Sequence, residues 1–120
     1  MIVTVDFDDC LCFSDTGEIN VTMLRIISTH AFVYDEIHIL TARTKEHEGI
    51  EGRVVIDEFI KEHNLPITAV HFTNHHEKGP FAKKIGSKRH YDDDIGHLDS
   101  VIAHGIEAYR VDGYDIWRHE

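Results

Sequence analysis

The feature that most constrains this chain is a short apolar strand that ends in closely spaced carboxylates. Ile2, Val3 and Val5 are β-branched residues, which favour a buried strand. Asp6 and Asp8 follow them, so like charges lie at the carboxyl end of the strand. Carboxylates this close repel each other, and a bound divalent cation usually relieves the repulsion. The stretch therefore predicts a metal site at a strand tip, where a carboxylate can also attack phosphorus.

Strand and helix patterns alternate along the rest of the chain. β-branched and apolar runs predict strands at residues 2–6, 36–40, 68–72, 88–91 and 106–111. Helical spacing of apolar residues predicts helices at about 19–30, 50–63, 80–85 and 97–104, with a polar loop at 44–49. This order predicts an α/β fold, a single Rossmann-like three-layer domain over residues 1–120 with a parallel five-stranded sheet and helices on both faces.

Two further predicted strands also end in polar residues. Thr41 and Arg43 follow the second strand, and Asp92, Asp93 and Asp94 follow the fourth. Parallel strands bring their carboxyl ends to one edge of the sheet, which is where ligands bind in such folds. We therefore expect these groups to meet the carboxylates of the first strand, and acidic clusters on separate strand tips are much stronger evidence than one Asp-x-Asp pattern.

The net charge and the lengths of the apolar runs restrict the classes of partner that this chain can bind. A net charge of −10 leaves no basic stripe for a nucleic-acid groove, so no tight duplex binding is expected. No apolar run reaches the roughly 20 residues that span a bilayer, and no signal peptide is evident, so we expect a cytoplasmic protein without membrane contact. Cys10 and Cys12 are expected to be loop or packing residues. Tyr114 and Trp117 near the C-terminus could pack on the sheet edge, form an interface or stack on a base, with packing favoured.

These motifs together resemble those of the haloacid dehalogenase (HAD) superfamily of phosphohydrolases, over nearly the whole chain. Residues 5–11, Val-Asp-Phe-Asp-Asp-Cys-Leu, are similar to the family's first motif, a strand followed by Asp-x-Asp-Gly-Thr/Val-Leu. The resemblance implies that Asp6 is the nucleophile and that Asp8 is the general acid and base. Asp9 stands where glycine is commonest and Cys10 where threonine or valine is usual, which leaves the local turn open.

The second and third motifs supply phosphate contacts. The segment Ile-His-Ile-Leu-Thr-Ala-Arg is similar to the family's strand that ends in threonine or serine. This implies that Thr41 binds the transferring phosphoryl group and that Arg43 grips substrate phosphate, with a solvated loop charge as the alternative for Arg43. The family's lysine neutralises the nucleophile and the phosphate. Lys78 is its best match, Lys83 and Lys84 are alternatives, and Lys84 is also a candidate substrate-binding residue.

The fourth motif supplies metal ligands. Residues 90–94, His-Tyr-Asp-Asp-Asp, resemble the family's strand that ends in Asp-Asp. The resemblance implies that Asp92 binds Mg²⁺ together with Asp6 and the backbone carbonyl of Asp8, while Asp93 binds through water or orients the site. Mg²⁺ prefers oxygen ligands in an octahedron, which agrees with this set. An acidic helix N-terminus is the alternative interpretation, because aspartate is favoured there.

These roles imply a Mg²⁺-dependent phosphatase that cleaves a phosphate monoester through an aspartyl-phosphate on Asp6. The gaps at 12–36 and 44–77 leave no room for the cap domain that many relatives carry. An open site implies either a large substrate, such as a phosphorylated polynucleotide end or a phosphoprotein, or a nucleotide or phosphosugar covered by a second subunit of a homo-oligomer. The Thr-Ala-Arg and Asp-Asp motifs look somewhat like those of polynucleotide kinase-phosphatases.

Two alternatives are binding modules. A catalytically inactive HAD-like module would bind phosphate and Mg²⁺ without turnover, but all the expected catalytic residue types are present. A receiver-like switch would carry its phosphoacceptor on the third strand, and the third predicted strand ends in Phe72, Thr73 and Asn74, without an acid. The enzyme is therefore favoured.

Overall fold

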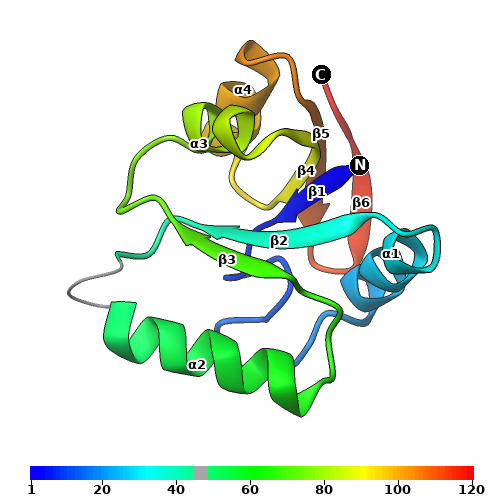
Figure 1. Ribbon diagram of the computed structural model, residues 1–120, viewed down its shortest axis with the longest axis vertical. Coiled ribbons are helices and arrows are strands. Elements are labelled where there is room, and N and C mark those ends of the chain that lie inside the picture. The colour runs from blue at the N-terminus through cyan, green and yellow to red at the C-terminus, as the bar shows by residue number, and fades with distance from the viewer. Residues whose placement is uncertain (45–48) are drawn as a thin grey trace.

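A twisted sheet runs through the middle of the computed structural model, which describes residues 1–44 and 49–120 (Figure 1). Six strands in these residues form it: β1 (Ile2–Val5), β2 (Glu36–Thr41), β3 (Ala69–Phe72), β4 (Ser87–Asp92), β5 (Glu107–Asp112) and β6 (Asp115–His119). Their order is β3-β2-β1-β4-β5-β6, and β1 to β5 are parallel. The strand with the first acidic motif therefore lies inside the sheet, between β2 and β4.

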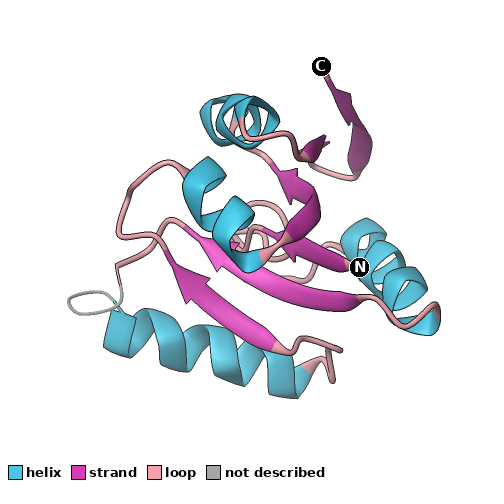
Figure 2. Cartoon of the chain, turned by 45° about the horizontal axis from the view of Figure 1, so that its top comes forward, coloured by secondary structure: helices cyan, strands magenta, loops and turns pink. Residues whose placement is uncertain are grey.

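Helices cover both faces of the sheet. α1 (Val21–Phe32) and α2 (Gly49–Glu62) pack on one face, and α3 (Lys78–Ile85) and α4 (Ile95–Ala103) pack on the other (Figures 1 and 2). The predicted three-layer α/β architecture is confirmed. The expected polar loop at 44–49 falls mostly on residues 45–48, outside the described residues, and α2 already begins at Gly49. None of the helices in the described parts is long and apolar enough to cross a membrane.

Alternation along β1 divides the interior into two cores. Val3 and Val5 face α1 and α2, where they join the larger apolar cluster. The smaller cluster on the α3 and α4 face consists of Leu40, Ala82, Leu98, Val101, Ile106 and Ala108. Thr4 alternates with Val3 and Val5 and is also fully buried. Polar groups therefore fill part of the layer beneath α3 and α4.

The sixth strand corrects the predicted five-stranded sheet. β6 pairs antiparallel with β5 through Ala108–His119, Arg110–Trp117 and Asp112–Asp115. Gly113, at φ +60°, sits in the turn, a conformation that glycine adopts without a steric cost. Most side chains of this segment are polar or exposed, so apolar alternation does not predict the strand, although the Asp-Gly turn before it is a hairpin signal. Trp117 lies in this edge strand and is 44% exposed, with the Arg110 guanidinium 5.4 Å from its ring centre, so its packing stays a prediction.

A close approach of α3 and α4 fixes where α3 begins. The Gly79 backbone N–H donates a hydrogen bond of 2.9 Å to Ser100 Oγ. A Cβ atom at position 79 would overlap Ser100 and His104 on α4. The lack of a side chain at Gly79 thus lets the first turn of α3 lie deep against α4, and it carries the neighbouring Lys78 into the interior.

We expect Gly79→Ala to lower the free energy of unfolding by about 2 kcal/mol, because the added methyl group overpacks the contact between α3 and α4. Urea unfolding followed by circular dichroism measures the change. Lys83→Ala, on the exposed side of the same helix, is the control and should shift stability by less than about 0.5 kcal/mol. Equal stability of Gly79→Ala and the parent chain would contradict the close contact.

Candidate active site

Three charged side chains meet at the carboxyl end of the central strands. The Lys78 ammonium donates hydrogen bonds of 2.8 Å to Asp6 Oδ1 and 2.7 Å to Asp92 Oδ2. The exposed fractions are 1% for Lys78, 6% for Asp6 and 0% for Asp92. The structure thus brings together the expected nucleophile, one of the three candidate lysines and the expected metal ligand.

The sheet register sets these contacts. Asp6 follows β1 and Asp92 ends β4, and the neighbouring residues Val5 and Tyr91 are paired across the two strands. The Asp6 backbone N–H continues this pairing with a hydrogen bond of 2.9 Å to the Tyr91 carbonyl. The two carboxylates therefore lie side by side, and the first residue of α3 supplies the cation from above the sheet.

Burial and charge pull the pKa values of these groups in different directions. Burial, reinforced by Asp92, raises the pKa of Asp6 well above its usual value. Burial would also raise the pKa of Asp92, but Lys78 and His90 together outweigh it and lower that pKa. Burial opposes the charge on Lys78 as well, yet Asp6 and Asp92 raise its pKa above the usual value. The ammonium therefore stays charged, and Asp92 is the firmly ionised carboxylate of the pair.

Two buried polar side chains, His90 and Thr4, form a series of hydrogen bonds that ends at Asp92. His90 Nε2 lies 2.7 Å from Asp92 Oδ2, and His90 Nδ1 lies 2.8 Å from Thr4 Oγ1. Burial lowers the pKa of His90, although Asp92 opposes the shift. A neutral imidazole must then donate from Nε2 to the carboxylate and accept from the threonine hydroxyl. Thr4 and His90 were not predicted as site residues from the sequence, although each lies two positions before an aspartate and hence on the same strand face.

Asp93 completes an oxygen-lined cluster. Oxygen atoms of Asp6, Asp92 and Asp93 lie within 4.8 Å of one another. Burial, with a contribution from Asp92, raises the pKa of Asp93 to about 6. Three crowded carboxylates with one lysine carry excess negative charge, and an all-oxygen donor set suits Mg²⁺. The residues present therefore fit a divalent cation.

Asp8 and Arg43 form a second ion pair at the rim. Arg43 Nε donates to Asp8 Oδ2 at 2.9 Å, and its Nη2 donates to Asp8 Oδ1 at 2.8 Å. The guanidinium carbon also lies 5.5 Å from the ring centre of Phe7. Thr41 is fully buried, and its hydroxyl accepts a hydrogen bond of 3.3 Å from the Arg43 backbone N–H. Among the described residues, the Thr41 hydroxyl is therefore hydrogen-bonded to Arg43 and not to the carboxylates of Asp6, Asp92 or Asp93.

The departures from the expected first motif have a local explanation. Asp9 adopts φ +57°, the left-handed region that glycine usually occupies and aspartate tolerates better than most residues. Its Oδ1 accepts hydrogen bonds from the Ser14 backbone N–H at 2.9 Å and the Ser14 hydroxyl at 2.7 Å. The turn that the sequence did not define is therefore a loop in which the Asp9 side chain stabilises the left-handed conformation of its own backbone. Cys10, fully buried, fills space beneath it.

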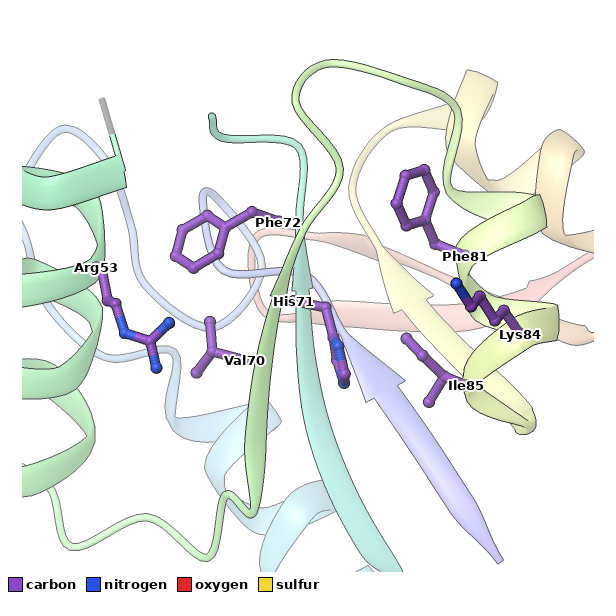
Figure 3. A pocket seen from close by; sticks show the side chains of 7 residues that line it. All are labelled: Arg53, Val70, His71, Phe72, Phe81, Lys84 and Ile85. Atoms are coloured by element: carbon purple, nitrogen blue, oxygen red, sulfur yellow. The ribbon is translucent and has the colours of Figure 1, made fainter. Parts of the chain in front are cut away.

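Lys84 lies away from the carboxylate cluster. It is exposed on α3 and lines a pocket of about 460 Å³ at the β3 edge of the sheet, with Arg53 of α2, His71 of β3 and Phe81 of α3 (Figure 3). The His71 ring is stacked on His38, with the ring centres 5.1 Å apart. A contact between Lys84 and substrate phosphate stays a prediction.

Comparisons with known proteins identify the fold. No family model matches the sequence, and no curated protein matches it either. Among solved structures, a chain of the Pnkp1/Rnl/Hen1 RNA repair complex aligns with a TM-score of 0.73 and 11% identity, over 91% of this chain and 41% of that chain. A second structure of the Pnkp1/Rnl/Hen1 complex aligns with a TM-score of 0.72 and 12% identity, over 94% of this chain and 46% of that chain.

A further structural relative is a phosphatase. D,D-heptose 1,7-bisphosphate phosphatase from B. bronchiseptica, solved with magnesium and phosphate, aligns with a TM-score of 0.60 and 8% identity, over 89% of this chain and 78% of that chain. The chain thus shares its α/β fold with these solved structures. The present chain spans less than half the length of the two chains from the RNA repair complex.

We expect Lys78→Met to lower the free energy of unfolding by roughly 3–5 kcal/mol without added metal, because two buried carboxylates lose their cation. Millimolar Mg²⁺ should restore part of the loss, since a divalent ion neutralises the same oxygens. Thermal and urea unfolding with and without Mg²⁺ test this. Lys83→Met is the matched control, and equal responses of the two variants would contradict a structural role for the Lys78 charge.

Proposed function

We propose that this chain is a Mg²⁺-dependent phosphatase that hydrolyses a phosphate monoester. The observation that carries the proposal is the buried Asp6 carboxylate, hydrogen-bonded to Lys78 and clustered with Asp92 and Asp93 at the ligand-binding edge of a HAD-like fold. A lysine beside a carboxylate nucleophile neutralises both the nucleophile and an incoming phosphate. The HAD-like phosphatase solved with magnesium and phosphate supports the same chemistry.

In the proposed reaction Asp6 is the nucleophile. A carboxylate oxygen of Asp6 forms a bond to phosphorus as the bond from phosphorus to the leaving oxygen breaks, which produces an aspartyl-phosphate. Asp8 gives a proton to the leaving oxygen, then accepts one from the water that cleaves the aspartyl-phosphate and releases inorganic phosphate. Lys78 and Asp92 hold Asp6 in position throughout. Asp6, Asp92, Asp93 and the Asp8 backbone carbonyl would hold Mg²⁺, which supplies charge neutralisation for the phosphoryl oxygens.

Arg43 links substrate binding to the availability of Asp8. While both guanidinium contacts to Asp8 persist, they occupy both of its carboxylate oxygens. Substrate phosphate offers Arg43 an alternative bidentate partner. In our proposal Arg43 turns from Asp8 to the phosphate, so that the Asp8 carboxyl group can reach the leaving oxygen only when substrate is present. Thr41, which fixes the Arg43 backbone, would bind the same phosphoryl group.

The structural relatives support a choice of substrate class. One pair of structural relatives belongs to an RNA repair complex, and another relative acts on a sugar bisphosphate. We propose a nucleotide, a phosphorylated polynucleotide end or a phosphosugar as substrate. In the described residues, the β1–β2 and β2–β3 connections contain only α1, α2 and loops, and no cap domain. A lid from a second copy in a homo-oligomer stays a prediction.

We expect hydrolysis of para-nitrophenyl phosphate that depends on Mg²⁺ and falls by roughly a thousandfold or more in Asp6→Asn, since the nucleophile is lost. Asp57→Asn, an exposed aspartate on α2, is the control and should keep its activity. Release of nitrophenolate at 405 nm measures both. Unchanged turnover in Asp6→Asn would contradict the proposed nucleophile. Mg²⁺-dependent labelling by acetyl phosphate without turnover would favour the binding module instead.

A further inference from the structure

A pocket opens beside the carboxylate cluster on the side of the β5–β6 hairpin. Its volume is about 450 Å³, within the range of small-ligand sites. Asp93 forms part of its wall, so the pocket adjoins the place where a phosphoryl group would meet Asp6. Phe13 and Asp15 line it from the loop after β1, and Arg110 and Asp112 line it from β5.

Arg110 stands out in this pocket because its charge is unsatisfied. Its Nε is buried without a hydrogen-bond partner, and within residues 1–44 and 49–120 no carboxylate forms an ion pair with it. Its guanidinium lies over the Trp117 ring instead, which leaves its N–H groups available to a ligand. In a chain of net charge −10, an arginine without an acidic partner beside a catalytic cluster indicates a missing acceptor.

The pocket walls are fixed before any ligand binds. The buried Asn20 amide donates hydrogen bonds to the Cys10 carbonyl at 3.0 Å and to the Gly113 carbonyl at 2.8 Å. It thereby ties the loop after β1 to the turn of the hairpin. Phe13 also packs edge to face against Tyr114, with the ring centres 5.3 Å apart. These contacts hold the two sides of the pocket at a set separation, as a preorganised binding site requires.

The charges of the walls restrict what can enter. Asp9, Asp15, Asp93 and Asp112 line the pocket with Arg110 as the one cation among its described lining residues. A second phosphate or a phosphodiester would be repelled by these carboxylates. Hydroxyl groups suit the same surface, because they donate to carboxylates and accept from a guanidinium. The aromatic side chain of Phe13 offers an apolar face for a sugar ring.

We propose that this pocket is the leaving-group subsite, that it takes an uncharged, hydroxyl-rich group such as the sugar of a phosphosugar or nucleoside monophosphate, and that Arg110 is its specificity-determining residue. The proposal rests on the phosphatase activity proposed above and narrows its substrate. Monophosphates are then preferred to bisphosphates and to polynucleotide ends, and the chain forms its own leaving-group site without a cap.

Two substrate comparisons test the subsite. Ribose 5-phosphate should be hydrolysed with a higher kcat/KM than phenyl phosphate, whose leaving group has no hydroxyl substituent. The kcat/KM for adenosine 3′-monophosphate should exceed that for adenosine 3′,5′-bisphosphate, and that for the dinucleotide with the same 3′-phosphate, by roughly tenfold, because the pocket carboxylates repel the additional phosphate. Equal or better use of the bisphosphate or the dinucleotide would overturn the proposal. Failure to hydrolyse even phenyl phosphate would instead reject the underlying activity.

Variants assign the preference to Arg110. In Arg110→Gln, the ratio of kcat/KM for ribose 5-phosphate to that for phenyl phosphate should fall by roughly tenfold, mainly through KM. Asp112→Asn should raise the relative use of the bisphosphate. Arg118→Gln is the matched control, since Arg118 lies on the same hairpin but pairs with Glu107 rather than lining the pocket. Equal ratios in Arg110→Gln, Arg118→Gln and the parent chain would overturn the role of Arg110.

Binding can also be measured without turnover. Trp117 is the only tryptophan of the chain, and its ring is covered by Arg110. In the Asp6→Asn background, ribose 5-phosphate with Mg²⁺ should change Trp117 fluorescence saturably, and Arg110→Gln should weaken the apparent affinity by roughly tenfold. Inorganic phosphate alone should bind without this change, because it reaches only the carboxylate cluster. Identical titrations with ribose 5-phosphate and inorganic phosphate would overturn the subsite.

Discussion

A single buried ammonium group organises the functional edge of this protein. Lys78 neutralises two carboxylates that the sheet register forces together, and neither carboxylate could be buried so deeply without it. Burying Lys78 beside these carboxylates also constrains neighbouring residues. Gly79 must lack a side chain so that α3 can approach α4 and deliver the lysine. His90 contacts the same Asp92 oxygen, Oδ2, that accepts from Lys78.

The four carboxylates of the site differ in how far neighbouring cations and hydrogen-bond donors compensate their charge. Lys78 and His90 satisfy Asp92, and Arg43 satisfies Asp8 at the rim. Asp6 and Asp93 keep raised pKa values because their surroundings compensate them less. Both carboxylates with raised pKa values are among the groups proposed to hold the metal. The structure concentrates the unfavourable electrostatics where a ligand would relieve them.

Much of the fold was predictable because its signals are local. Apolar strands that end in polar tips, and helices between them, follow directly from residue spacing, and they placed Asp6, Thr41 and Asp92 at one edge. The sixth strand was missed because an exposed edge strand lacks a clear apolar alternation. Missing it also hid Arg110, whose contact with Trp117 exists only once the hairpin forms. The place of Lys78 just ahead of a short helix favoured it over Lys84 from the sequence, but its burial depends on the depth of α3 in the interior, which spacing alone does not give.

The division of the interior into two cores has a consequence for how the protein comes apart. The α1 and α2 face is joined to the sheet by the larger apolar cluster, whereas α3 and α4 rest on a smaller cluster and on a polar network. Polar contacts are exchanged for water at little net cost, so the thinner layer can detach while the opposite layer stays packed. Because that layer carries Lys78, a brief local opening would remove the lysine from Asp6 and Asp92 while the α1 and α2 face stays folded. We therefore expect the candidate site and the larger apolar core, which lie on opposite sides of one sheet, to open separately.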